Sequence, residues 1–277
     1  MKPKPFKLAL IQMLVRGGEQ SLNVSHALEL IAAASSHGAD VALLPECLDL
    51  GWAHPASQTM AGEIPSGTVC QALMNSAARH DIHLCAGLTE KYGHQVFNAA
   101  VLIDNHGKLL CQHRKIHELE IAHPYYAQGD RLNIAETHFG TFGLMICADA
   151  FAQDRVLTRS LGYLGADVIL SPCAWAVPAD HDQNHQPYGQ LWRDSYIPVA
   201  KEFSIPIVGV SNVGKITSGP WQGRNCIGCS LAIDAQGNEL VQGPYGVDQE
   251  CILYIDINPV ARPARGTAWT DIWKADA

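Results

Sequence analysis

The 277-residue chain lacks any uninterrupted run of about 18 apolar residues, the length that a membrane-spanning helix requires. It also lacks a low-complexity linker or a long run of like charge that would divide it into parts. Lysine and arginine number only 19 against 27 acidic residues, so the net charge of -8 excludes attraction to nucleic acid or anionic lipid through the overall field. The basic N-terminus is too short and too rich in proline for a signal peptide. We therefore expect one soluble, cytoplasmic domain spanning residues 1–277, with no nucleic-acid or membrane partner.

The cysteines do not form the compact pattern of a secreted, disulfide-bonded protein. Their number is nine, an odd count, and most of them lie within apolar runs of strand-like composition. Thiols in such positions are usually reduced packing residues of a cytosolic protein. A cysteine with a chemical role must therefore be identified by its setting.

The two halves of the chain repeat one order of elements. Apolar runs predict strands, helical periodicity predicts helices, and Gly38-Ala39-Asp40-Val41 closely matches Gly165-Ala166-Asp167-Val168. Two such halves imply two mixed sheets that pack face to face with helices outside, a four-layer α-β-β-α sandwich of the α/β class. In this pairing Glu46 and Cys173 are equivalent. The predicted elements are strands 7–13, 39–46 and 82–89, helices 21–36 and 66–80 and a hairpin at 98–112, then strands 141–147, 166–173 and 205–211, helices 154–164 and 187–203 and a hairpin at 229–242.

Three reactive side chains stand at or near the ends of predicted strands. They are Glu46 in Leu43-Leu44-Pro45-Glu46, Lys115 in His113-Arg114-Lys115-Ile116-His117, and Cys147 after Gly143-Leu144-Met145-Ile146. A thiol can act as a nucleophile, a carboxylate as its general base, and an ammonium as an oxyanion stabiliser together with the backbone N–H of Ala148. We expect Lys115 and the start of a following helix to lower the pKa of Cys147, and burial to raise the pKa of Glu46.

With these motifs in order, the chain resembles the nitrilase superfamily of carbon–nitrogen hydrolases over nearly its whole length. Further shared marks are Gly129-Asp130, Ser171-Pro172-Cys173-Ala174-Trp175, Asn212-Val213-Gly214 and Gly228-Cys229-Ser230. The resemblance implies an α-β-β-α sandwich, no metal or organic cofactor, and a homodimer or higher homo-oligomer. It also implies Cys147 as nucleophile, Glu46 as general base and Lys115 as oxyanion stabiliser. Sheet edges and the segment 252–273 are expected partner surfaces by the same resemblance.

Several positions depart from the family pattern. A supporting glutamate follows the lysine in many members, and here Glu118 and Glu120 are both candidates, with Glu120 favoured on spacing. Nitrile-hydrolysing relatives typically carry Trp-Glu after the cysteine, whereas this chain has Ala148-Asp149, which favours an amide or N-carbamoyl substrate. Phe151 stands near the place where many amidases have arginine. We expect Trp175 to line the substrate pocket, and loops 52–55 and 123–126 to offer further walls.

The predicted function is hydrolysis of an amide or N-carbamoyl compound through an acyl-thioester, with release of ammonia or an amine. Other functions remain open. The same site could hydrolyse a nitrile or transfer its acyl group to an amine or alcohol. A different class is a catalytically silent protein on this scaffold, or a zinc protein. Cys226-Ile227-Gly228-Cys229 with His181 and His185 at helical spacing would supply four zinc ligands.

Overall fold

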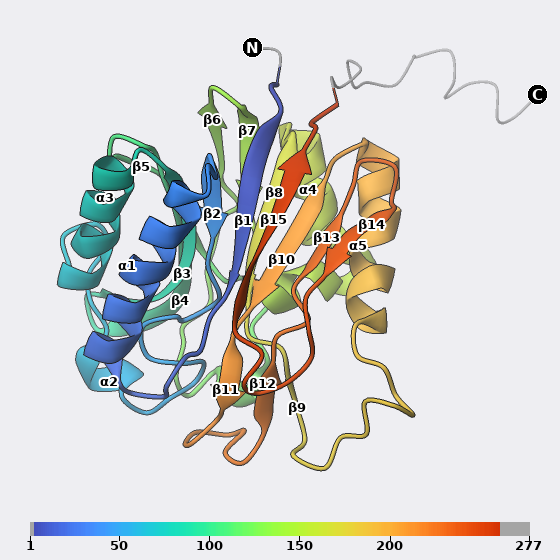
Figure 1. The fold of residues 1–277 in the computed structure, drawn as a ribbon. Coiled ribbons are helices and arrows are strands. Elements are labelled where there is room, and N and C mark those ends of the chain that lie inside the picture. The colour runs from blue at the N-terminus through green and yellow to red at the C-terminus, as the bar shows by residue number, and fades with distance from the viewer. Residues whose placement is uncertain (1–2, 261–277) are drawn as a thin grey trace, which may run out of the picture.

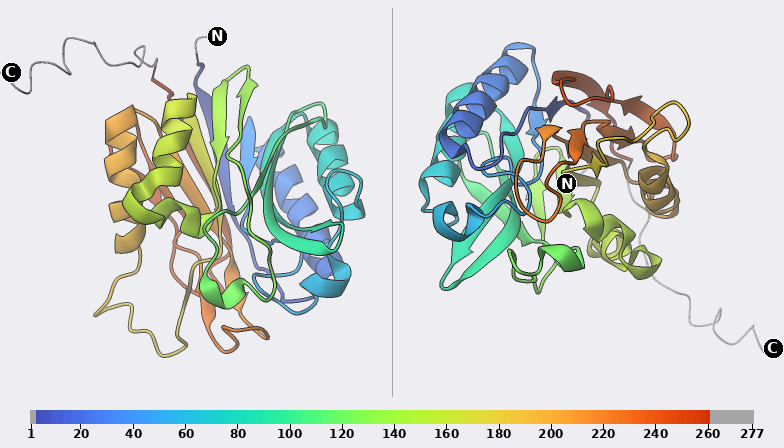
Figure 2. Two further views of the ribbon diagram at one scale, coloured as in Figure 1. Left: turned by 180° about the vertical axis from the view of Figure 1, so that it is seen from behind. Right: turned by 90° about the horizontal axis from the view of Figure 1, so that it is seen from below.

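The computed structural model describes residues 3–260 as two six-stranded sheets packed face to face between two pairs of helices (Figure 1). This confirms the predicted four-layer sandwich. Strands of the two sheets contact each other through β1, β2 and β3 on one side and β8 and β10 on the other. The view from behind in Figure 2 shows the same layers, with the helices on the two outer faces.

The first sheet is built from the N-terminal half of the chain and one late strand. Its central strands β1, β2 and β3 are parallel, because helices connect them, whereas β3, β4 and β5 form an antiparallel meander. In order across the sheet the strands are β15 (Cys251–Ile257), β1 (Phe6–Gln12), β2 (Val41–Leu43), β3 (His83–Tyr92), β4 (Gln95–Ile103) and β5 (Leu109–Arg114).

The second sheet repeats this order. An antiparallel edge strand, three parallel strands and an antiparallel hairpin follow one another, so β7 corresponds to β1 and β8 to β2. The internal repeat predicted from the sequence is therefore present in the strand order. The strands are β6 (Ile134–Thr137), β7 (Gly140–Leu144), β8 (Val168–Cys173), β10 (Ile207–Ser211), β13 (Leu231–Ile233) and β14 (Glu239–Gln242).

The helices cover the outer faces and leave the inner faces to pack on each other. Ala27 and Ile31 of α1 and Leu73 of α3 bury against the outer face of the first sheet, while the largest core cluster lies between the sheets and continues under α4 and α5. The helices are α1 (Gln20–Ser36), α2 (Ser57–Met60), α3 (Thr68–His80), α4 (Val156–Leu164) and α5 (Gln190–Phe203). Within the described range, no helix combines the length and the apolar character that crossing a bilayer demands.

A small third sheet lies beyond the carboxyl ends of the central parallel strands, at the lower end of Figure 1. It consists of β11 (Val213–Lys215), β12 (Asn225–Ile227) and β9 (Ala176–Val177), short strands that the sequence patterns did not predict. Because β9 follows β8 directly, this sheet brings the loops of the second half over the strand ends that carry the reactive residues.

The predicted C-terminal partner surface is described only in part. Residues Cys251–Ile257 form β15, which pairs along its whole length with β1 and so completes the first sheet at its edge. The remainder of the predicted segment, from residue 261 to 273, lies outside the described residues.

Candidate active site

Glu46 lies at the start of the turn that follows β2, where the first sheet contacts the second. Its backbone N–H donates to the carbonyl of Cys173 at 3.1 Å, so the two positions that the repeat makes equivalent bond to each other. Gly87 of β3 permits this turn, because a Cβ there would lie 2.5 Å from the Cα of Glu46. The side chain of Glu46 is 1% exposed. Burial raises the pKa of its carboxyl group, and the nearby charge of Lys115 offsets only part of that effect.

Lys115 comes directly after β5 and is held by backbone and side-chain contacts. Its N–H donates to the carbonyl of Asn98 at 2.9 Å, and its Nζ lies 2.7 Å from Glu46 Oε1 and 3.0 Å from Glu118 Oε1. Burial by itself would lower the pKa of Lys115, but the carboxylates of Glu118 and Glu46 outweigh burial and raise that pKa well above its usual value. Lys115 is therefore a protonated, fixed cation inside the site.

Glu118, and not Glu120, supports this lysine, which corrects the preference drawn from spacing. Glu118 is buried beside Lys115, whereas Glu120 is exposed in a short 3-10 helix, Glu120–Ala122. The reason is that the strand ends at Arg114, so the alternation of a strand no longer applies to the residues that follow. A turn instead brings the third residue after Lys115 back toward its ammonium group.

Asn98 of β4 joins the two carboxylates and was missed in the sequence. Its Nδ2 donates to Glu46 Oε1 at 2.6 Å and to Glu118 Oε2 at 3.0 Å, and its side chain is buried. The available signal was a polar amide within the apolar run Val96-Phe97-Asn98-Ala99-Ala100, since a buried polar side chain needs partners. Glu46 Oε2 forms no hydrogen bond with residues 3–260, so only one oxygen of this carboxylate is occupied.

Cys147 lies on a sharp turn between β7 and a 3-10 helix, Cys147–Phe151, as the expected strand-to-helix elbow requires. Its φ of 44° is in the left-handed region, and its N–H donates to Ser171 Oγ at 3.1 Å. The expectation of a lowered thiol pKa is wrong. Burial raises the pKa of Cys147 well above its usual value, with a hydrogen bond to Cys173 and the charge of Glu46 acting the same way, and the opposing effect of Lys115 is smaller.

Asp149 connects the cysteine turn to the lysine segment. Its Oδ2 accepts hydrogen bonds from the N–H of Ile146 at 2.9 Å and from His113 Nε2 at 2.8 Å. Its Oδ1 accepts from the N–H groups of Ile116 at 3.1 Å and His117 at 2.8 Å. Burial would raise the pKa of Asp149, but these donors, with His113 foremost, lower it overall. One carboxylate thus binds the His113 side chain before Lys115 and the backbone after Lys115 to the turn that carries Cys147.

Glu46, Lys115 and Cys147 line one cavity of about 320 Å³. The structure therefore brings the three predicted catalytic residues together. Ala148 and Trp175 also line the cavity, as expected of substrate-binding residues. From the loop 52–55, Trp52 lines the cavity as well. The segment 123–126 is not part of the lining, since Tyr126 instead packs against Cys47 behind the site.

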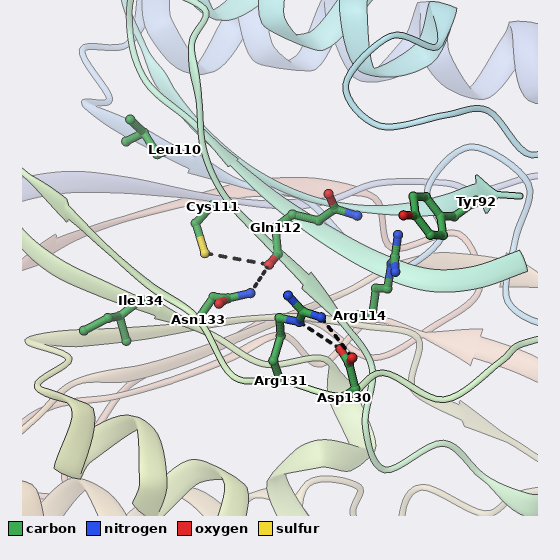
Figure 3. A pocket seen from close by; sticks show the side chains of 9 residues that line it. All are labelled: Tyr92, Leu110, Cys111, Gln112, Arg114, Asp130, Arg131, Asn133 and Ile134. Atoms are coloured by element: carbon green, nitrogen blue, oxygen red, sulfur yellow. Dashed lines mark hydrogen bonds and ion pairs between the residues drawn. The ribbon is translucent and has the colours of Figure 1, made fainter.

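A larger hollow of about 480 Å³ lies elsewhere, along β5 and the segment 130–134 (Figure 3). Its charged groups are already paired, Arg131 with Asp130 at 2.9 Å and Arg114 with Glu90 at 2.7 Å. Burial raises the pKa of Cys111 in its wall to about 12, which leaves that thiol protonated. The residues that line this hollow therefore offer neither an activated nucleophile nor an unpaired charge.

The residues of the zinc hypothesis do not come together as that hypothesis requires. His181 and His185 precede α5 in a segment of turns, so their helical spacing is wrong, and His185 Nδ1 instead lies 2.6 Å from Asp182 Oδ2. Burial raises the pKa values of Cys226 and Cys229 to about 12. Across residues 3–260 no three His, Cys, Asp or Glu side chains are grouped so that they could hold a metal ion.

Comparison with known sequences agrees with this geometry. The chain is 32% identical over 176 residues to a nitrilase of Pyrococcus abyssi, covering 62% of this chain and 66% of that protein, just under two thirds of its length. It is 28% identical over 236 residues to an (R)-stereoselective amidase of a Pseudomonas species, covering 85% of this chain and 80% of that enzyme.

Solved structures share the fold. A carbon–nitrogen hydrolase of Helicobacter pylori superposes with a TM-score of 0.81 at 21% identity, covering 91% of this chain and 89% of that one. A mutant amidase of Nesterenkonia, solved with acrylamide added to its active-site cysteine, has a TM-score of 0.77 at 19% identity and covers 91% of this chain and 93% of that one. The family model described as carbon-nitrogen hydrolase matches residues 7–265. The chain therefore belongs to the carbon–nitrogen hydrolase family of the nitrilase superfamily.

Proposed function

We propose that this enzyme hydrolyses the C–N bond of a small linear amide or N-carbamoyl compound through an acyl-thioester on Cys147. The observation that carries the proposal is the presence of Cys147, Glu46 and Lys115 in one cavity, with a single carboxylate oxygen of Glu46 left without a partner. An amidase among the relatives, and a cysteine adduct in a related amidase structure, support the same chemistry.

Acylation begins from a protonated thiol, because the pKa of Cys147 is raised in its buried site. Glu46 Oε2 takes the thiol proton as the sulfur forms a bond to the carbonyl carbon of the substrate. Lys115 and the backbone N–H of Ala148 stabilise the negative oxygen of the tetrahedral intermediate. The C–N bond then breaks, and the leaving nitrogen takes the proton from Glu46 and departs as ammonia or an amine.

Deacylation uses the same base a second time. Glu46 takes a proton from water as the water oxygen attacks the thioester carbon, and Lys115 again stabilises the negative oxygen. The carbon–sulfur bond breaks, the sulfur regains the proton from Glu46, and a carboxylic acid leaves. Glu118 and Asn98 act through Glu46 and Lys115, because they hold both in place without reaching the cavity lining.

A panel of small amides, N-carbamoyl compounds and nitriles tests the proposal. We expect ammonia from members of the first two groups and a covalent mass increase on Cys147 during turnover. The variant Cys147→Ala should form neither, whereas Cys251→Ala, which changes a cysteine outside the cavity, should form both. Ammonia release that survives in Cys147→Ala would overturn the mechanism. Turnover of nitriles alone, or acyl transfer to an added amine in place of hydrolysis, would reassign the reaction.

The proposal further takes residues 1–277 as one catalytic domain of a cytoplasmic homo-oligomer. Glu46 and Lys115 come from the first half of the chain and Cys147 from the second, so the site requires both halves. The cysteines of the described residues are free thiols, as expected in a reducing compartment. Light scattering of the purified protein measures the oligomeric state, and a monomer would contradict that part of the proposal.

A further inference from the structure

The cavity that holds Cys147 is lined mainly by apolar and aromatic residues. Of its fourteen lining residues only Glu46 and Lys115 carry charge, and six are aromatic: Trp52, Phe151, Trp175, Tyr188, Trp192 and Trp221. A volume of about 320 Å³ is suited to a small organic molecule.

Aromatic pairs form two sides of this cavity. Trp52 and Trp221 lie with their ring centroids 4.6 Å apart, and Arg224 rests on the Trp221 ring with its guanidinium carbon 4.8 Å from the centroid. On the other side Trp175 stacks on Trp192 at 4.6 Å. These rings are fixed by their contacts, so the apolar walls exist before a substrate enters.

In the wall formed by Trp175, Trp192 and Tyr188, some of the polar atoms are hydrogen-bonded to each other. Trp192 Nε1 donates to the hydroxyl of Tyr188 at 2.9 Å. The backbone of Trp175 is held by its N–H, which donates to Ser211 Oγ at 2.8 Å, and by its carbonyl, which accepts from Ile227. Trp175 Nε1 is the exception, because it has no hydrogen-bond partner among the described residues. Apart from this one donor, the wall presents mainly ring surface to a ligand.

The single cation of the lining, Lys115, serves the reacting carbonyl in the proposed mechanism, so it is not available to a carboxylate elsewhere in the substrate. Lys115 Nζ already lies within 3.0 Å of carboxylate oxygens of both Glu46 and Glu118, so this buried group of three charges is negative overall. A second carboxylate brought into the cavity would lose its hydration and meet that negative charge without a free partner. A neutral apolar group would instead gain from burial against the rings.

We propose that the acyl group of the substrate is neutral and apolar, an aryl-alkyl or branched alkyl group that lies against the tryptophans. This inference rests on the proposed amide hydrolysis and narrows its substrate class. The carbonyl carbon sits at Cys147 and the small leaving group faces Glu46, so the acyl side chain extends along the aromatic walls toward Leu191 and Trp221, which are more exposed than the buried Trp175 and Trp192.

A pair of amides matched in heavy atoms tests the substrate class. The monoamide of adipic acid and 6-methylheptanamide differ in a terminal carboxylate against a terminal isopropyl group. We expect kcat/KM for 6-methylheptanamide, and for phenylacetamide, to exceed that for the acidic amide by about tenfold or more. An equal or higher value for the acidic amide would overturn the inference and leave the proposed function standing. No ammonia from any amide would overturn the proposed function itself.

Two matched variants test the electrostatic reason. Leu191→Arg places a cation at the rim of the cavity, and Leu240→Arg places one on β14, outside the lining; the two side chains are 53% and 42% exposed. Leu191→Arg should raise kcat/KM for the acidic amide relative to 6-methylheptanamide, whereas Leu240→Arg should leave the ratio unchanged. The same ratio in both variants and the wild type would contradict the argument.

Binding without turnover gives an independent measure. In Cys147→Ala, the tryptophans of the cavity report a ligand through their fluorescence. Titration should give a lower Kd for phenylacetamide than for the monoamide of adipic acid, and the reverse order would overturn the inference even if rates were limited by another step.

Discussion

Asp149 Oδ2 lies 2.8 Å from His113 Nε2, and both side chains are completely buried. Through its other hydrogen bonds the same carboxylate holds the N–H groups of Ile146, Ile116 and His117. The nucleophile turn and the lysine segment, which come from different sheets, are thus joined by one side chain. Asp149 is a positioning residue, since it is absent from the cavity lining.

Replacing Asp149 with Asn should weaken both the fold and the site. The amide keeps the shape but removes the charge and one acceptor from a buried cluster of donors, so we expect a loss of about 3 kcal/mol in the free energy of unfolding. Because Lys115 and Cys147 are then no longer held in a fixed relative position, kcat should fall by about tenfold or more with a smaller change in KM. Urea unfolding and steady-state kinetics measure the two effects.

Asp167→Asn is the matched control for this substitution. Asp167 directly precedes β8 and lies outside the cavity lining. It is also buried, and its Oδ2 accepts a hydrogen bond from the backbone N–H of Thr141 at 2.8 Å. This variant should lose stability while the folded fraction keeps its kcat. If both variants lowered kcat alike, Asp149 would have only a general structural role.

Glu118 and Glu120 provide a natural pair of neighbours for testing the support of Lys115. Glu118→Gln removes a carboxylate 3.0 Å from Lys115 Nζ, so the ammonium should become less well fixed and kcat should fall about tenfold to a hundredfold. Glu120→Gln changes an exposed side chain and should leave kcat unchanged. Ammonia release by the two purified variants decides the matter, and a larger loss in Glu120→Gln would reverse the assignment.

The contrast between these two glutamates shows where sequence patterns stop being informative. Strand and helix periodicities predicted the repeated halves, and the motifs around Glu46, Lys115 and Cys147 identified residues that the fold brings together. The position of Glu118 depends on a turn after β5 that no periodicity encodes. Asn98 and Asp149 gain their roles from partners in other elements, such as Glu46, 52 residues from Asn98, and His113, 36 residues from Asp149.

The raised pKa of Cys147 could likewise not be predicted from the sequence. The pKa of this thiol depends mainly on how completely the two sheets bury it. The local order of strand, cysteine and helix had instead predicted a lowered pKa. The position of β15 beside β1 also depends on contacts between distant parts of the chain. Residues such as Gln12 and Cys251 pair although they lie near opposite ends of the described chain.

Glu46→Gln tests the general base. The amide retains a side chain of the same size but cannot accept the proton of the thiol or of water, so kcat should fall about a hundredfold to ten-thousandfold. Glu136→Gln, a change at an exposed site on β6, should have no effect. An enzyme with Glu46→Gln that retained wild-type kcat would show that the proton goes elsewhere.

The pH dependence of the wild-type enzyme follows from the same carboxylate. Glu46 must be ionised to act as a base, and burial raises its pKa above the usual value of 4.5. The acidic limb of kcat/KM should therefore lie at a higher pH than an exposed carboxylate would give. A limb at or below pH 4.5 would contradict the raised pKa.

Asp49 makes a separate prediction about stability. It is buried behind Glu46, where its Oδ1 accepts hydrogen bonds from the N–H and the hydroxyl of Thr89. Burial raises its pKa from 3.8 to about 6, with the Thr89 bonds opposing the change. Between these two values the folded protein binds the proton more strongly than the unfolded chain, so the free energy of unfolding falls as pH rises through that window.

The loss should amount to about 3 kcal/mol by pH 7, since each unit of pKa difference corresponds to about 1.4 kcal/mol. In Asp49→Asn the side-chain oxygen still accepts from Thr89 but does not ionise, so this part of the pH dependence should disappear. Urea unfolding at several pH values between about 4 and 7 compares the two proteins, with Glu29→Gln, a change at an exposed carboxylate, as the control. If wild type and Asp49→Asn lost stability equally over this range, the proton would be bound by a group other than Asp49.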